Sequence, residues 1–178
     1  MPLHPALVHL PLGLAILMPI FAAGFGWAFW SGRVRLRAWI AVVGLQAVLL
    51  TSGLVALQTG RAEGERVEKV VQESAIESHE DAAEVFLWAV GATLVLSALA
   101  FAMPKPGGSK AIVLASALAM VGCAALALRV GHAGGQLVYV NNAGSAYVTG
   151  AANNNAGGKG EATAPAAGKK DDDDQREK

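Results

Sequence analysis

Residues 111–130 read AIVLASALAMVGCAALALRV, a stretch of twenty positions whose one charged side chain is Arg129. A helix needs about 20 mostly apolar residues to cross the hydrocarbon core of a bilayer. A helix also satisfies its own backbone N–H and C=O groups, which lipid cannot do. The stretch therefore predicts a membrane-spanning helix.

Three further stretches have the same length and character. They cover about residues 5–30, 38–58 and 81–103. Of the 178 residues, 53% are hydrophobic and 16% are charged, whereas soluble domains carry about 25% charged residues. We therefore predict an all-α membrane protein, with a four-transmembrane-helix bundle in residues 1–148. A disordered, low-complexity tail is expected over residues 149–178, and the lipid bilayer is the first partner implied.

Basic residues near the ends of the spans predict the orientation. The two short connections, after the first and third spans, contain Arg33, Arg35, Arg37, Lys105 and Lys110. The opposite side carries one basic residue fewer, namely Arg61, Arg66, Lys69 and Arg129. Because Lys and Arg are enriched in cytoplasmic loops, we expect the short connections in the cytoplasm. Both termini then lie on the periplasmic side of a bacterial inner membrane.

Two polar segments are expected on that outer side. Apolar residues at near-helical spacing in residues 59–79 suggest a short amphipathic helix on the membrane surface. An extension of the third span is the alternative. After the fourth span, GGQLVYV at 134–140 is predicted to be a short strand or extended segment, with Gly134 and Gly135 allowing a sharp turn.

Small side chains recur at every fourth position of the fourth span. Membrane helices use such seams because their backbones can then approach closely. The seam would consist of Ala111, Ala115, Ala119, Cys123 and Ala127.

All four histidines fall on one face of the membrane in this topology. His4 and His9 open the first span, His79 precedes the third, and His132 follows the fourth. Imidazole nitrogens are common ligands of iron, copper and zinc. Ionisable groups near or within spans are costly and usually functional. Arg129 lies three residues before His132, so both face nearly the same side of a continuing helix.

Two kinds of bound group fit these side chains. Histidines from two helices can hold the iron of haem b, and Arg129 is at a suitable level for a propionate. The haem candidates are His9, His79 and His132. His9 is preferred to His4 because the two lie about 140° apart around a regular helix. A bare copper or zinc ion would instead draw on His4, His9, His79, His132 and Glu80.

These hypotheses lead to three possible functions. Binding of haem b predicts an electron-transfer protein, and binding of a metal ion predicts a divalent-metal binding or transport protein. A non-catalytic structural subunit of a membrane complex is the third, and the oligomeric state stays open. An enzyme is disfavoured, because no nucleophile and base, phosphate loop or pair of buried carboxylates is evident. No nucleic-acid partner is expected for this chain of zero net charge.

Several motifs resemble one known family. HPALVHLPLG at 4–13 resembles the opening HPxxVHxPxG of an uncharacterised bacterial membrane-protein family, domain of unknown function 2231. The resemblance continues in TGRAEGERVE at 59–68, HEDAAE at 79–84 and GHAGGQLVYVNNAG at 131–144. It covers about residues 3–148. The family ending resembles GHxGGxLVYxHGxG, from which the chain departs at Asn141 and Asn142. The role of a histidine there is absent or replaced.

The resemblance implies a four-helix membrane domain, often encoded near or fused to cytochrome c modules. It suggests a b-type haem or another redox role, with a periplasmic cytochrome c or other redox membrane subunits as partners. The positions that match the family motifs are His4, His9, His79 and His132, with Gly134 and Gly135.

Overall fold

The computed structural model describes residues 4–146, and the tail predicted for residues 149–178 lies outside them. The described residues contain helices and no strand. Their order is α1 (His4–Leu7), α2 (His9–Trp30), η1 (Leu36–Trp39), α3 (Ile40–Val67), α4 (Glu73–Leu99), η2 (Ala100–Ala102) and α5 (Pro106–Tyr139). Four helical stretches, built on α2, α3, α4 and α5, are long and apolar enough to cross a membrane. The prediction of an all-helical chain with four such helices is confirmed.

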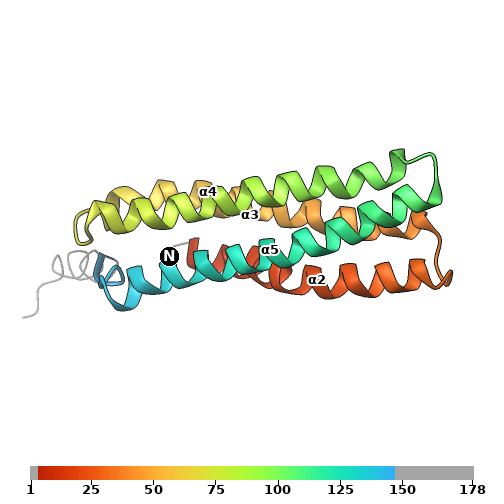
Figure 1. Cartoon of the computed structure of the whole chain (residues 1–178). Helices are drawn as coiled ribbons and strands as arrows, with labels where there is room; N and C mark the ends of the chain where they lie inside the picture. The colour runs from red at the N-terminus through yellow and green to blue at the C-terminus, as the bar shows by residue number, and fades with distance from the viewer. Residues whose placement is uncertain (1–3, 147–178) are drawn as a thin grey trace, which may run out of the picture.

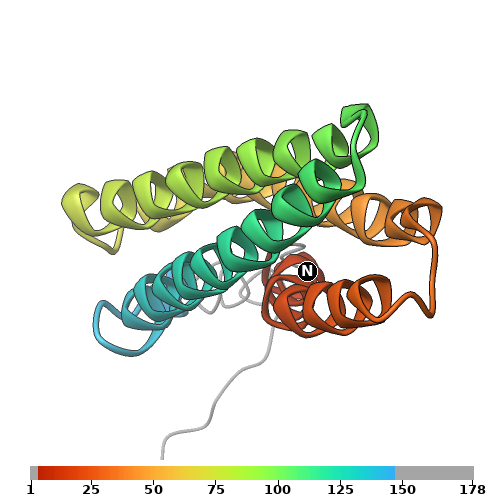
Figure 2. The same ribbon diagram turned by 45° about the vertical axis from the view of Figure 1, so that its right-hand side comes forward.

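The long helices form an antiparallel bundle (Figure 1). The connections from α2 to α3 and from α4 to α5 lie at one end, here called the basic end, with Arg33, Arg35, Arg37, Lys105 and Lys110. The opposite end holds α1, the turn between α3 and α4, and the end of α5. We call it the histidine end, because all four histidines belong to it. α5 packs against both α4 and α2 and lies between them in the turned view (Figure 2).

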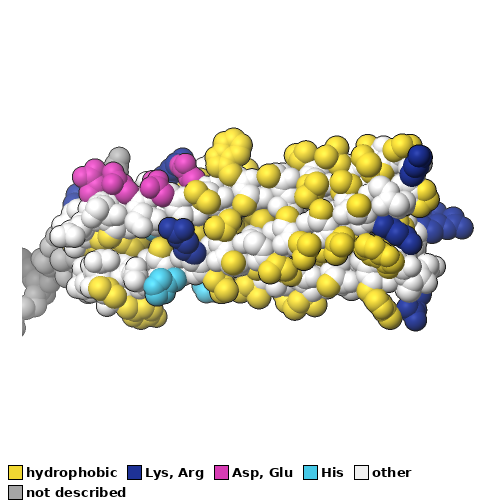
Figure 3. Space-filling view, viewed as in Figure 1, with side chains coloured by type: hydrophobic (Ala, Val, Ile, Leu, Met, Phe, Trp, Pro, Cys, Tyr) yellow, Lys and Arg dark blue, Asp and Glu magenta, His cyan; other side chains and the backbone are white. Residues whose placement is uncertain are grey.

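The surface of the bundle divides into bands. Figure 3 shows acidic side chains gathered at the histidine end and most Lys and Arg side chains at the basic end. Hydrophobic side chains cover the surface between them. Large ones point outward, such as Trp88, which is 80% exposed, and Leu118, which is 65% exposed. An apolar patch this extensive is rare on a soluble monomer, and it fits contact with lipid.

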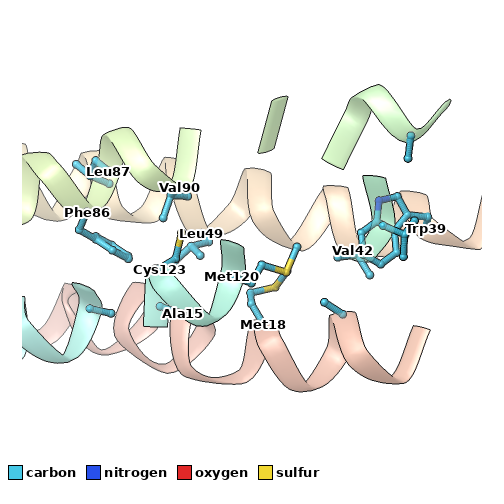
Figure 4. Close-up of a cluster of buried hydrophobic side chains, with 14 residues drawn as sticks. Ala15, Met18, Trp39, Val42, Leu49, Phe86, Leu87, Val90, Met120 and Cys123 are labelled. Carbon is cyan, nitrogen blue, oxygen red and sulfur yellow. The ribbon is translucent and has the colours of Figure 1, made fainter. Parts of the chain in front are cut away.

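The interior is closely packed around sulfur-containing and aliphatic side chains (Figure 4). Met18 of α2 and Met120 of α5 are almost fully buried, together with Val42 and Leu49 of α3. Nearer the basic end, the Trp39 indole N–H donates to the carbonyl oxygen of Ser97 at 3.1 Å. This bond ties the start of the second span to the end of the third.

The buried face of α5 differs from the predicted seam. Its buried residues alternate steps of four and three, as Ser109, Val113, Ser116, Met120, Cys123 and Ala127. Cys123 and Ala127 were in the seam, but Ala111 and Ala115 are exposed, so the prediction is wrong at those two positions. A strict step of four residues turns about 40° further around the helix each time, and the seam therefore leaves the interface.

The helices extend further at the histidine end than the sequence suggested. α3 runs to Val67 and α4 begins at Glu73, so residues 59–79 mainly extend the two spans. The prediction of a short helix lying on the membrane surface is therefore wrong. The alternative, a helical extension of the third span, is confirmed for residues 73–79. α5 has 34 residues, a length of about 51 Å at 1.5 Å per residue, against a hydrocarbon core of about 30 Å. The long helices therefore project beyond the apolar band.

α5 also continues through Gly134 and Gly135 to Tyr139, so the predicted strand and sharp turn at 134–140 are wrong. The chain turns later, at Asn142, whose φ of 55° is left-handed. Asn tolerates this conformation better than most residues with a side chain.

Candidate functional site

The first span begins with an interrupted helix. α1 ends at Leu7 and α2 begins at His9, with Val8 between them. Pro11 has no N–H for the carbonyl of Leu7, and its ring crowds that carbonyl, which explains the position of the break. Because the helix is interrupted, His4 and His9 are not held at the fixed angle that a continuous helix would impose on them. His4 is partly buried, whereas His9 is exposed.

His4 is held against α3 by hydrogen bonds. Its Nδ1 lies 2.8 Å from the carbonyl oxygen of Ala56. A carbonyl oxygen only accepts, so Nδ1 carries the proton in this contact, and Nε2 of the neutral ring has the lone pair. The hydroxyl of Thr59 lies 3.4 Å from the same Nδ1. The backbone N–H of His4 donates to Oε1 of Glu63 at 3.4 Å.

Gly60 makes room for the His4 ring. A β-carbon at residue 60 would lie 2.9 Å from Cε1 of His4 and 3.2 Å from its Nδ1. Real β-carbons essentially never come within 3.0 Å of such an atom. Only glycine at this position of α3 allows the ring to occupy its place.

His79 of α4 packs against a glycine of α5, much as His4 packs against Gly60 of α3. A β-carbon on Gly134 would lie 3.2 Å from Cε1 of His79. The ring also faces the backbone carbonyl of Val130 and is close enough to His4 for charges on the two rings to repel. Its Nδ1 is buried and has no hydrogen-bond partner within residues 4–146. His4 and His79 are therefore both partly buried between helices at the histidine end.

The other two histidines face outward. His132 is exposed, and the side-chain amide of Gln136 donates to its Nε2 at 3.2 Å. A β-carbon on Gly131 would lie 3.8 Å from the methyl carbons of Leu12, so α5 at residue 131 is level with α2 at residue 12. His9 and His132 therefore lie at a similar level on neighbouring helices, and Arg129 is exposed nearby on α5.

Glu80 is engaged with a cation. Nε of Arg61 lies 3.8 Å from Oε2 of Glu80, and Arg61 also bonds to Glu84. All three side chains are at least one-third exposed. Such surface ion pairs contribute at most about 1 kcal/mol, but this one directs Glu80 toward α3.

The structure thus separates the predicted site residues into two sets. His4 and His79 are partly buried and near enough for their charges to interact, while His9, His132 and Arg129 are exposed and Glu80 pairs with Arg61. In the described part of the chain, no group of three or more His, Cys, Asp or Glu side chains is placed to hold a metal ion. The sequence reasoning preferred His9 to His4 and missed Gly60. A glycine inside a helix costs about 1 kcal/mol relative to alanine, and this was the available signal of a close contact.

Comparison of the chain with protein-family models, with curated proteins and with solved structures found no match. The function of the site must therefore follow from the chemistry of its own residues.

Proposed function

We propose that this chain is a multi-pass membrane protein that binds a copper or zinc ion through His4 and His79 at the histidine end of the bundle. The observation that carries the proposal is the pair of partly buried imidazoles at one end of the bundle, each packed against a glycine of a neighbouring helix and near enough for their charges to interact. Imidazole nitrogen suits both metals, and copper is bound more tightly than zinc by most sites of this kind.

The hydrogen bond of His4 supports this role. Metal-binding histidines usually donate the N–H of one ring nitrogen to a carbonyl or carboxylate, which fixes the ring and leaves the other nitrogen for the metal. The Ala56 carbonyl takes the Nδ1 proton of His4, so Nε2 is the proposed ligand atom. In His79, the proposed ligand atom is the buried Nδ1, which has no hydrogen-bond partner among residues 4–146.

Two protein ligands favour an exchangeable ion. Structural zinc sites are closed by four protein ligands, whereas sites with open positions accept water or a substrate. Here the two imidazoles leave positions open, which suits a protein that takes up and passes on an ion. Acidic side chains gather at the same end of the molecule (Figure 3), and negative charge raises the local concentration of cations.

Haem b is the second candidate, and a different observation favours it. His9 and His132 lie at a similar level outside α2 and α5, with Arg129 nearby. The packed interior does not fit a porphyrin, since an enclosed void in the middle of the bundle measures about 10 Å³. That is about the space of one water molecule. A haem would therefore rest against the outer face of α2 and α5, exchanging electrons with a cytochrome c or another redox membrane subunit.

Four histidine variants separate the two candidates. Purified full-length protein would be equilibrated with copper or zinc, and bound metal would be measured by elemental analysis. His4→Ala and His79→Ala should each weaken binding at least about tenfold, because a ligand is lost. The matched variants His9→Ala and His132→Ala should bind as the unchanged protein does. The opposite pattern would contradict the interior metal site.

The same samples test the haem candidate. A Soret band that shifts on reduction and disappears in His9→Ala or His132→Ala would favour haem b. If all four variants retain metal and show no haem, the structural-subunit function predicted from the sequence becomes the better account.

The proposed location is the bacterial inner membrane, with the basic end in the cytoplasm and both termini in the periplasm. The sorting of charge between the two ends supports this orientation. Membership of the family of domain of unknown function 2231 is likewise a proposal. Asn142 gives it some support: the residue has a left-handed φ and stands where the ending GHxGGxLVYxHGxG has a glycine.

A further inference from the structure

The basic end carries five cationic side chains and no acidic side chain to balance them. Residues 4–62 and 85–146, which include both of its connections, contain neither Asp nor Glu. At the histidine end, by contrast, Arg61 pairs with Glu80 and Glu84. Figure 3 shows cationic side chains where the band of hydrophobic side chains ends. The positive charge of the basic end is therefore available to an anion from outside the chain.

One of these cations is held in place where α2 ends. The guanidinium carbon of Arg33 lies 4.3 Å from the centre of the Trp27 ring, well within the range of about 6 Å for a cation–π contact. Its Nη1 donates to the hydroxyl oxygen of Ser31 at 2.8 Å. The side chain makes this one hydrogen bond within residues 4–146. Since a guanidinium has several N–H groups, donors remain for a ligand.

A second cation reaches the same helix from α5. Nζ of Lys110 lies 5.9 Å from the centre of the Trp30 ring, just inside the range of about 6 Å for a cation–π contact. Trp27 and Trp30 are three residues apart on α2, so their side chains are neighbours on the surface of that helix. Arg33 and Lys110, which are distant in the sequence, therefore contact neighbouring rings.

Exposed apolar side chains continue from both cations toward the middle of the bundle. On α5, Leu114 and Leu118 follow Lys110 at steps of four residues, and both are exposed. On α2, Ile20 lies about two turns before Trp27 and is also exposed. Tryptophan is enriched at the level of lipid headgroups. The order of cation, tryptophan and aliphatic side chain therefore fits a ligand with an anionic head and apolar tails.

We propose that an anionic phospholipid binds here, with its phosphate between Arg33 and Lys110 and its acyl chains along α2 and α5. Negatively charged lipid attracts basic residues beside a membrane span, and side chains already held in place lose less conformational freedom on binding. A free phosphate ion has the same charge but makes no use of the apolar rows, which favours the lipid. The site rests on the proposed membrane location and is independent of metal binding at the histidine end.

Quenching of tryptophan fluorescence by brominated lipids tests which lipid lies against these rings. Full-length protein with Trp88→Phe would be placed in phosphatidylcholine vesicles that contain a minor share of phosphatidylglycerol. Trp27 and Trp30 are then the exposed tryptophans, because Trp39 is buried. Either lipid would be brominated, at equal mole fractions of brominated lipid. The apparent affinity for the anionic lipid should exceed that for the neutral lipid by about fivefold for each of the two cations.

Single substitutions test the two cations. Arg33→Gln and Lys110→Gln should each lower the preference for the anionic lipid about fivefold. Arg35→Gln is the matched control, because it removes the same charge from the same end, and Arg35 is exposed and contacts no ring within residues 4–146. It should lower the preference much less. Circular dichroism in the same vesicles would establish that each variant keeps its helices.

Four results would overturn the proposal. Equal losses in the three variants would show diffuse attraction by charge and no defined site. Equal quenching by the two brominated lipids would exclude the lipid site and leave the membrane location intact, whereas no quenching by either would contradict both. A loss of preference on adding inorganic phosphate, but not potassium chloride at the same ionic strength, would make a soluble anion the ligand.

Discussion

His4 lies so close to Gly60 that a β-carbon on the glycine would stand 2.9 Å from Cε1 of the imidazole. The glycine belongs to α3 and the histidine to α1, so this contact holds the start of the chain against the second span. Gly134 of α5 serves His79 in the same way, at 3.2 Å. Each interior histidine thus depends on a residue without a side chain, and glycine substitutions can move the rings without removing them.

Gly60→Ala should displace the His4 ring and weaken copper or zinc binding by about 10- to 100-fold, the usual effect of disturbing the support of a metal ligand. Gly64→Ala is the matched control, because a β-carbon at Gly64 meets nothing within 4 Å. Isothermal titration with each metal would compare the two variants. Equal affinities would show that the position of His4 does not matter for binding.

Gly134→Ala should have a smaller effect than Gly60→Ala, since 3.2 Å requires a shift of only a few tenths of an ångström. We expect weaker metal binding by about tenfold or less. In Gly135→Ala the added β-carbon would have no neighbour within 4 Å, so this variant should leave the metal affinity unchanged. A larger loss in Gly135→Ala than in Gly134→Ala would refute the assignment of His79 to this contact.

Gly53→Ala should destabilise the bundle itself. The added β-carbon would lie 2.6 Å from Cδ2 of Leu87, and overpacking of this kind costs about 1–3 kcal/mol. Gly44→Ala on the same helix has open space around it and should be neutral or slightly stabilising, because alanine favours helix. Thermal unfolding in detergent, followed by circular dichroism, would measure the difference. Similar melting temperatures would mean that α3 and α4 pack less closely here.

Trp39→Phe should lower the free energy of unfolding by about 0.5–1.5 kcal/mol, the net value of one hydrogen bond. The variant removes the N–H that bonds to the Ser97 carbonyl inside the bundle. Trp88→Phe is the control, since Trp88 is 80% exposed and should change little. Urea unfolding of both variants in the same micelles would test this, and an equal loss in the two would contradict a specific role for the buried bond.

The proposed orientation can be tested with single cysteines in a Cys123→Ala background. Ser74→Cys lies exposed near the start of α4, and Ser31→Cys lies exposed after α2. A membrane-impermeant maleimide should label the former from outside the inner membrane and the latter only after permeabilisation. The reverse labelling would place the basic end outside.

The hydrophobic pattern was sufficient to predict the four apolar helices and to place all histidines at one end. An even number of crossings decides that arrangement, whatever the details of packing. The helix ends were harder, because residues 59–67 and 131–139 are polar or rich in glycine and resemble loops. Their helices persist because neighbouring helices pack beside them, and sequence periodicity alone does not report such contacts.

That His4 rather than His9 is partly buried was also beyond the sequence. A regular helix from Pro5 onward would have given His9 the better position, and the interruption at Val8 changed it. The sequence shows Pro11 and so indicates a break in the helix. The direction of the four residues before the break, His4–Leu7, depends on the residues against which they pack. They meet Gly60, which lies more than fifty positions away along the chain.

Extended X-ray absorption fine structure, measured above the absorption edge of the bound metal, tests the central claim most directly. This measurement counts the imidazole ligands around the ion. Protein loaded with one equivalent of copper or zinc should show two imidazoles, one in His79→Ala, and two again in His132→Ala. A metal shell of oxygen atoms alone, or one unchanged in His79→Ala, would contradict an ion held between His4 and His79.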